Sequence, residues 1–462
     1  MSNISAKYFW PLIAVMIHII VLIVYANEDL IYSNILFILY GGVLLFVSVS
    51  YAGKSTMSPI MFVCALFLFY TYLPMFDRLV LVQLIENSEH LKYMEIPYLY
   101  MNKEDDVIFS HSIIYTAINF IIVILSYKHF IRKQFSPRIV FRSENPLFLV
   151  YVYSVIIFLL ITILYVGNVG DIVNVKWNSR SDLITHIFEL IKLMSIISIV
   201  GAIFAFVEKP GFNRLVLIIL LVISLMAVLT LGGSRRHLIW ILLISLFLIH
   251  YFIRRISVIH VLLLFVLMLL VVIAGDILRS SGFTMSALLV RPEASDLLRG
   301  NTEYNAAHGI LMELFARKNE MVFLNGQSIV KPILAIIPRE IYPSKPIPIT
   351  QLMAELIYPN QVGHSVGASF FGEMYFNFSY FGALASFFYG WLVSYVSRRL
   401  EYMMNLYHTK TKRITIELLF FVILYLSLFN FFRGPFADSF YFIIAFILIL
   451  SPYLKIIVRR RN

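Results

Sequence analysis

The stretch VIFSHSIIYTAINFIIVILS, residues 107–126, is a run of 20 residues that contains no Asp, Glu, Lys or Arg. A helix needs about 20 mainly apolar residues to cross the hydrocarbon core of a bilayer. Acidic residues precede the stretch at Glu104, Asp105 and Asp106, and a basic loop begins after it at Lys128. Because cytoplasmic loops carry the excess of Lys and Arg, the stretch predicts a transmembrane helix whose C-terminal end faces the cytoplasm.

The composition of the whole chain indicates many such helices. Hydrophobic residues make up 60% of the 462 positions and charged residues only 14%, whereas soluble globular domains are about 45–50% apolar. The net charge of +11 comes from basic residues clustered in short loops, where they act as topology signals, so no nucleic-acid partner is expected. The single cysteine, Cys64, lies inside an apolar run, which excludes a disulfide framework. The fold class is therefore an all-α polytopic integral membrane protein.

Twelve segments of the chain are long and apolar enough to be transmembrane helices. A loop of about 90 residues separates the ninth from the tenth, and it is too long and too well patterned to be a linker. The tenth segment exceeds the usual length of about 17–25 residues, so we expect it to tilt, kink or extend beyond the bilayer. The expected segments are residues 9–26, 31–50, 57–75, 107–126, 147–167, 187–207, 214–231, 237–253, 257–275, 367–397, 415–431 and 436–456.

The positive charge of the loops sets the expected orientation. Basic residues crowd every second loop and the C-terminal tail, whereas residues 76–106 are acidic, so both termini are expected in the cytoplasm. Three regions follow: residues 1–275 with the first nine spans, an outer loop at 276–366, and residues 367–462 with the last three spans and the basic tail. Apolar residues recur at helical spacing in the outer loop, which predicts short amphipathic helices there.

Ionisable residues are nearly absent from the middle of the spans and gather at their outer ends. Because a charge in lipid is costly, we expect the functional site at the outer interface, open to water and headgroups. Guanidinium groups bind phosphate oxygens in bidentate fashion and keep their charge, which favours a lipid-linked diphosphate as the ligand. The candidate diphosphate-binding residues are Arg235, Arg236, Arg291, Arg339, Lys345 and Arg433.

These cationic candidates also have structural interpretations. The turn Gly232–Ser234 precedes Arg235 and Arg236 and leaves backbone N–H groups free for an anion. The same two arginines equally fit a short outer turn whose side chains snorkel to lipid phosphate. Arg433 also fits an ion pair with Asp438 that steadies the last outer turn.

His364 and Glu373 are the candidates for a general base. They follow the Pro-rich stretch Ile337–Pro346, which contains Arg339 and Lys345, on the approach to the tenth span. Glycosyl transfer from a diphosphate donor needs cations for the leaving group and a base for the acceptor hydroxyl. As alternatives, His364 fits a capping or packing residue, and Glu373 fits a hydrogen bond to a neighbouring helix.

Familiar nucleotide and metal motifs are missing from the chain. It contains no P-loop, Gly-rich dinucleotide fingerprint or HExxH motif, and no Asp-x-Asp is placed to hold a metal-bound sugar nucleotide. We therefore expect no metal and no cofactor.

An ordered set of short motifs resembles the Wzy family, the O-antigen or oligosaccharide repeat unit polymerases. The set comprises the Gly-Gly-Ser-Arg turn at Gly232–Arg235, the Ile-Pro-Arg…Pro-Ser-Lys-Pro stretch at Ile337–Pro346, and a Gly-Glu-Met-Tyr…Phe-Gly segment within Gly367–Gly382. The enterobacterial common antigen polymerase is similar to the chain in its turn, its Pro-rich stretch and an Arg before the last span. The chain departs from the members that carry Arg-x10-Gly motifs in two outer loops.

The resemblance implies a metal-independent, inverting glycosyltransferase of the GT-C type in the bacterial inner membrane. Such enzymes act in lipopolysaccharide and other polysaccharide biosynthesis. They move the growing glycan from undecaprenyl diphosphate to the non-reducing sugar of an incoming lipid-linked repeat unit in the periplasm. The resemblance also implies a Wzz-type chain-length regulator as a partner.

Other functions also fit the architecture. An O-antigen ligase shares the fold class and the lipid donor but transfers the glycan to lipid A-core. A flippase or transporter of lipid-linked oligosaccharide tends to have internal repeats and broken polar helices at the midplane, and the sequence shows neither. A non-catalytic membrane scaffold is the remaining alternative.

Overall fold

The computed structural model describes about half of the chain. The described residues are 2–24, 30–52, 58–76, 105–132, 139–143, 302–335, 347–357, 369–408, 416–434 and 454–458, with the single positions 79, 156, 247, 250, 251, 256, 342, 436, 440 and 443.

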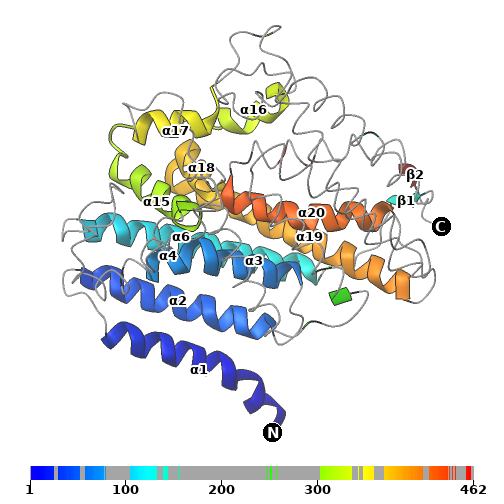
Figure 1. Ribbon diagram of the computed structural model, residues 1–462, viewed down its shortest axis with the longest axis horizontal. Coiled ribbons are helices and arrows are strands. Elements are labelled where there is room, and N and C mark those ends of the chain that lie inside the picture. Colours follow the sequence, from blue (N-terminus) through cyan, green and yellow to red (C-terminus); the bar gives the residue numbers. More distant parts are fainter. Residues whose placement is uncertain are drawn as a thin grey trace, which may run out of the picture.

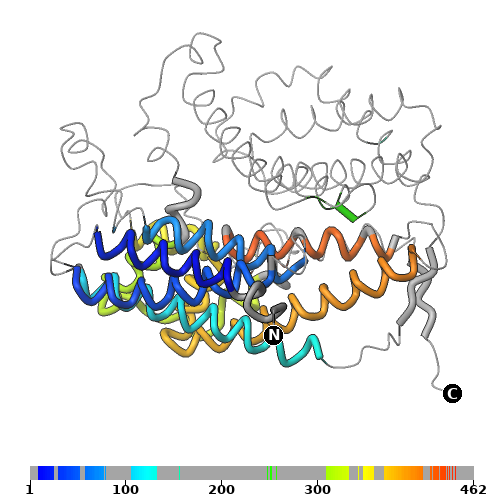
Figure 2. The backbone as a smooth tube through the Cα atoms, turned by 90° about the horizontal axis from the view of Figure 1, so that it is seen from below, coloured from blue at the N-terminus to red at the C-terminus, as the bar shows by residue number. Residues whose placement is uncertain are grey.

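The described part is helical apart from one pair of short strands (Figure 1). The long helices run in roughly the same direction in two perpendicular views (Figures 1 and 2), so they form a bundle. The helices are α1 Ser2–Val24, α2 Ile31–Ala52, α3 Pro59–Phe67, the π-helical η2 Leu68–Tyr72, α4 Leu73–Phe76, α6 Asp105–Ile131, α15 Thr302–Ala316, α16 Gln327–Ala335, α17 Ile349–Ile357, α18 Phe370–Phe378, the 3-10 helix η7 Ser379–Leu384, α19 Ala385–Leu406 and α20 Ile416–Arg433. The strands are β1 Ile139–Ser143 and β2 Leu454–Val458.

Three described helices are long and apolar enough to cross a membrane: Ile31–Tyr51, Pro59–Phe76 and Asp106–Ile131. They coincide with the second, third and fourth expected spans. Shorter apolar helices at Phe9–Val24 and Phe420–Phe432 overlap the first and eleventh. The expected spans at 147–167, 187–207, 214–231, 237–253, 257–275 and 436–456 lie almost entirely outside the described residues.

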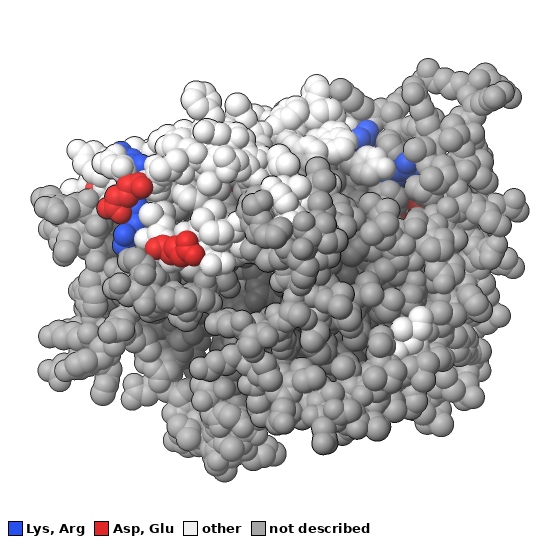
Figure 3. Space-filling view, turned by 90° about the horizontal axis from the view of Figure 1, so that it is seen from above, with Lys and Arg blue, Asp and Glu red and all other residues white. Residues whose placement is uncertain are grey.

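Many large apolar side chains are exposed on the described helices, as expected for helices in contact with lipid. Along α6 the exposed residues Val107, Ile114, Ile118, Ile121 and Leu125 recur at helical spacing and share one face. From above, charged side chains of the described part lie toward its two ends, with an uncharged band between them (Figure 3). A soluble protein rarely exposes so continuous an apolar surface, so the apolar helices support a membrane protein.

The long tenth expected span breaks into three pieces. Helix α18 ends at Phe378, the 3-10 helix η7 follows, and α19 then begins at Ala385. The break occurs at Ser379, whose φ of 54° is uncommon for a residue other than glycine. Gly382 makes the fold-back possible, because a Cβ there would lie 2.2 Å from the carbonyl oxygen of Met374.

Small residues let α6 and α19 pack closely. A Cβ added to Gly390 would lie 2.5 Å from the carbonyl oxygen of Val123, so the two backbones nearly touch. Ser126 Oγ donates to the carbonyl of Phe387 at 2.7 Å. Small residues and serine hydrogen bonds are typical of helix pairs in membranes, because the hydrophobic effect does not drive helices together within lipid.

Helix α1 is attached to the bundle through His18. Its Nε2 lies 3.2 Å from the carbonyl oxygen of Phe37, and its Nδ1 lies 2.9 Å from the hydroxyl of Tyr72. Gly41 leaves space for the imidazole, because a Cβ there would lie 2.4 Å from Nε2. Both ring nitrogens are therefore engaged, and this ionisable group within a span ties helices together.

Helices α2 and α6 begin at the same end of the bundle. The carboxylate of Asp106 accepts hydrogen bonds from the backbone N–H groups of Tyr32 at 3.3 Å and Ser33 at 3.0 Å. A carboxylate is favourable there because the first N–H groups of a helix have no partner within it. Asp106, which the sequence assigns to an acidic loop, thus caps a neighbouring helix.

The strand pair joins two segments that are far apart in the sequence. Strands β1 and β2 are antiparallel, and Ile139 pairs with Val458 at one end of the ladder and Ser143 with Leu454 at the other. The pairing places the segment after α6 beside the C-terminal tail. This is compatible with the expected location of both segments on one side of the membrane.

Cysteine labelling tests the expected orientation. Val322, between α15 and α16, is 83% exposed, and His408, just beyond α19, is also exposed. In right-side-out membrane vesicles, a membrane-impermeant maleimide should modify Val322→Cys at once and His408→Cys only after permeabilisation. The native Cys64 is buried and should stay unlabelled. The opposite pattern of labelling would overturn the orientation.

Candidate functional site

Glu373 lies at the centre of a buried polar site between α16, α18 and the end of α20. Its side chain is 0% exposed. One carboxylate oxygen, Oε1, accepts a hydrogen bond from Ser328 Oγ at 2.5 Å. The other, Oε2, accepts one from the backbone N–H of Phe436. One carboxylate therefore joins three segments of the chain.

Asn377, one helical turn after Glu373, extends this site. Its Nδ2 donates to Ser328 Oγ at 2.7 Å and to the carbonyl of Glu373 at 2.9 Å, and its Oδ1 accepts from the N–H of Gly326 at 3.0 Å. We call these side chains, Ser328, Glu373 and Asn377, together with the N–H groups of Gly326 and Phe436, the Glu373 network.

Local sequence signals position α18 within the network. At its start, Ser369 has an extended backbone and its Oγ accepts from the N–H of Gly372 at 3.2 Å, as an N-cap residue does. At its end, the N–H groups of Leu324 and Asn325 donate to the carbonyls of Phe376 and Asn377 at 3.2 and 3.1 Å. These bonds satisfy carbonyls that have no partner within the helix.

The chain turns directly after Leu324, where two consecutive residues adopt left-handed conformations. Asn325 has a φ of 48° and Gly326 a φ of 87°, which suit asparagine and glycine. Helix α16 begins immediately afterwards at Gln327. The turn thus places Ser328, the second residue of α16, against the carboxylate of Glu373.

Aromatic packing holds α18 against α15 and α6. The ring of Tyr375 lies 4.3 Å from that of Phe315 and 5.4 Å from that of Tyr115, centroid to centroid. The Tyr115 hydroxyl donates to the carbonyl of Phe371 at 3.2 Å. Residues 370–377 of α18 are all buried, so this helix is a rigid support for the network.

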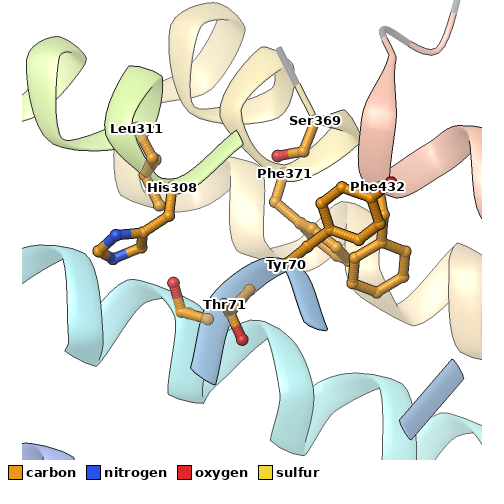
Figure 4. Close-up of a pocket in the computed structure, with 8 residues that line it drawn as sticks. Tyr70, Thr71, His308, Leu311, Ser369, Phe371 and Phe432 are labelled. Atoms are coloured by element: carbon orange, nitrogen blue, oxygen red, sulfur yellow. The ribbon is translucent and has the colours of Figure 1, made fainter. Parts of the chain in front are cut away.

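A small cavity adjoins α18 on the side of the bundle. Its volume of about 20 Å³ has room for about one water molecule and not for a sugar. His308 from α15 extends toward α6, and the rings of Tyr70, Phe371 and Phe432 gather on the other side (Figure 4). His308 Nε2 lies 3.2 Å from Ser112 Oγ. The cavity is lined by Tyr70, Thr71, Thr116, His308, Leu311, Ser369, Phe371 and Phe432.

The structure describes two of the sequence-predicted site residues. Glu373 makes the kind of hydrogen bonds that the sequence left as the alternative to a base. Arg433 is the last residue of α20, three positions before Phe436, so its place in the chain adjoins the Glu373 network. The other candidates lie outside the described residues: Arg235, Arg236, Arg291, Arg339, Lys345 and His364.

Sequence reasoning missed Ser328, Lys331 and Asn377. Lys331 is 8% exposed and lies on α16, three residues after Ser328, so the two share a helix face. A signal for Asn377 was present: Glu373 and Asn377 are the two side chains with carboxylate or amide groups in FFGEMYFNF. Their spacing of four residues predicts one polar stripe.

One arginine of the outer loop is engaged in ion pairs. Arg317 Nε lies 3.2 Å from Glu313 Oε2, and its Nη1 lies 3.5 Å from Glu320 Oε2. These ion pairs lie at the C-terminal end of α15, so Arg317 has a structural role.

The described residues contain no group of three or more His, Cys, Asp and Glu side chains close enough to hold a metal ion. Comparisons with known proteins give no matching family model, no matching curated protein and no matching solved structure.

Proposed function

We propose that this protein is a polysaccharide polymerase of the Wzy type, a metal-independent inverting glycosyltransferase of the bacterial inner membrane with a GT-C-like architecture. It transfers a growing glycan from undecaprenyl diphosphate to the non-reducing end of an incoming lipid-linked repeat unit at the periplasmic face. Its substrates are two lipid-linked oligosaccharides, and it works beside a Wzz-type chain-length regulator.

The observation that carries this proposal is the ordered set of motifs in residues 232–382. One of them, Gly-Glu-Met-Tyr…Phe-Gly, corresponds to a compact unit in the structure. Glu373 joins α16, α18 and Phe436, and Gly382 packs against the Met374 carbonyl. Two residues of this motif, Glu373 and Gly382, therefore make specific tertiary contacts. These contacts support the view that the motif is not a chance match.

The six cationic candidates are assigned to the diphosphates of the donor and the acceptor. Arg235, Arg236, Arg291, Arg339, Lys345 and Arg433 lie in outer segments by the expected topology, where lipid-linked diphosphates are within reach. Bidentate hydrogen bonds from guanidinium groups hold the diphosphate of the donor and disperse the negative charge that develops as it leaves.

The transfer step needs a base and no metal. The acceptor hydroxyl oxygen attacks the anomeric carbon of the donor and forms the new glycosidic bond with inversion. The bond from that carbon to the diphosphate oxygen breaks, and its electron pair leaves on undecaprenyl diphosphate. The hydroxyl proton passes to the base, for which His364 and Glu373 are the candidates. The complete burial of Glu373 favours His364.

Reconstitution of the purified protein tests the proposal. Liposomes containing the protein are given lipid-linked repeat units, with a chelator and without any nucleotide sugar. We expect a ladder of lipid-linked polymer on gels. Transfer only after addition of lipid A-core would identify a ligase instead. Movement of intact repeat units across the bilayer without polymer would identify a transporter.

A further inference from the structure

We propose that Glu373 is a positioning residue: through the Glu373 network it fixes Phe436, three residues after Arg433, against α16. The end of α20 at Arg433 is thereby held in place for the donor diphosphate. This inference rests on the proposed function for its catalytic consequence, but its structural part stands without it.

The contacts of Glu373 support a positioning role over proton transfer. Both carboxylate oxygens already accept hydrogen bonds, one from Ser328 Oγ and one from the N–H of Phe436. The side chain is 0% exposed and Ser328 is 4% exposed. A general base must lie within hydrogen-bond reach of the substrate proton, so an acceptor hydroxyl could reach this fully buried carboxylate only by opening the packing around α18.

The positions of Ser328 and Phe436 in the chain show which segments Glu373 connects. Ser328 is the second residue of α16, which begins at Gln327. Phe436 follows the end of α20 at Arg433. The N–H of Gly434 donates to the Asn430 carbonyl at 2.8 Å, which couples the turn after Arg433 to the last turn of α20. The carboxylate therefore connects the start of α16 to the segment that follows Arg433.

Packing makes this bridge rigid. The ring of Phe436 lies 6.1 Å from that of Phe370 on α18 and 6.2 Å from that of Phe431 on α20. Asn377, one turn after Glu373 on α18, also donates to Ser328 Oγ at 2.7 Å. A buried carboxylate favours one arrangement of its hydrogen-bond partners, because leaving a buried polar group without a partner is unfavourable.

The first experiment measures the position of the 433–436 segment and needs no enzymatic assay. The reporter is a cysteine at Ala437, the next residue after Phe436, in the otherwise intact protein. The native Cys64 is buried and gives a low background. We expect Ser328→Ala and Glu373→Gln each to change the maleimide labelling rate of the reporter several-fold, because the segment loses its anchor.

A matched control is Ser427→Ala. Ser427 is also buried, but its Oγ donates to the Ile423 carbonyl of its own helix at 3.0 Å, so the labelling rate should not change. Ser328→Ala is the leading variant, because it removes one hydroxyl and leaves the carboxylate in place. An unchanged labelling rate in folded Ser328→Ala and Glu373→Gln proteins would overturn the structural bridge.

The second experiment separates positioning from proton transfer in the polymerase assay. We expect Ser328→Ala and Glu373→Gln to lower kcat and to raise the KM for the lipid-linked donor by similar factors, on the order of 10²-fold in kcat/KM, as small misplacements do. The acid limb of the pH–rate profile should be retained in both variants. Loss of that limb in Glu373→Gln with near-normal activity in Ser328→Ala would make Glu373 a base and refute the inference.

The two experiments also separate this inference from the proposed function. If the wild-type protein makes no polymer, the proposed function fails, and the labelling rates still decide whether the bridge exists. If polymer forms and the labelling rates do not respond, the bridge fails and the function stands.

Discussion

Replacing Arg433 by alanine is expected to abolish long polymer and leave single lipid-linked repeat units on gels. Removing one charged donor that stabilises a leaving group lowers kcat by about 10²–10³-fold. The same result is expected for Arg235→Ala and Arg339→Ala, because the proposed function assigns each of these arginines to diphosphate binding. The measurement is the initial rate of polymer formation in reconstituted liposomes, with protein amounts matched by blotting.

Arg317→Ala is the matched control for this series. Arg317 belongs to the same expected outer region, but it forms ion pairs with Glu313 and Glu320, so its removal should leave polymerisation near the wild-type rate. Arg433→Lys should recover only part of the activity, because lysine is a point charge and cannot bind phosphate with a fork. Normal ladders from all three alanine variants would refute diphosphate binding by these arginines.

The second large effect concerns stability at the other end of the bundle. Arg399 Nη1 on α19 lies 3.3 Å from Glu417 Oε1 on α20, and the two side chains are only 6% and 3% exposed. The guanidinium also lies over the rings of Tyr395 and Phe421, at 5.6 and 5.5 Å from their centroids. Glu417→Ala leaves a buried positive charge without its carboxylate, so we expect a loss of about 3–5 kcal/mol in the free energy of unfolding.

Thermal unfolding in detergent measures this loss. Cys64 is buried, so a thiol-reactive dye reports its exposure as the bundle opens. The control Glu401→Ala removes an exposed carboxylate from α19 and should change the unfolding temperature little. The double variant Arg399→Met with Glu417→Leu should recover much of the stability, because an apolar pair replaces the buried ions. Equal losses in the single and double variants would contradict this account.

Arg399 illustrates what the sequence pattern leaves out. The basic pair at 398–399 reads as a topology signal in a short loop. In the structure α19 continues to Leu406, and Arg399 is buried against Glu417. The number of basic residues in a loop predicts which side of the membrane the loop faces. It does not show which of these residues forms an ion pair with a helix later in the chain.

Span lengths were the most predictable feature. The expected spans at 31–50, 57–75 and 107–126 coincide with three described helices, because about 20 uncharged residues in a row have few alternatives to a membrane helix. The excessive length of the segment 367–397 predicted an irregularity. Its form, a break at Ser379 followed by a 3-10 helix, depends on the contact between Gly382 and Met374 and was not predictable from length.

The sequence by itself determined that this is a membrane protein, and its short motifs motivate the proposal of a polymerase, because hydrophobic runs, charge bias and motifs are local properties. Only the tertiary structure decided which polar groups are engaged. Ser328 and Phe436 reach Glu373 across separations of 45 and 63 residues. Hydrogen bonds at such separations depend on how helices pack, and buried polar groups must find partners wherever the packing brings them.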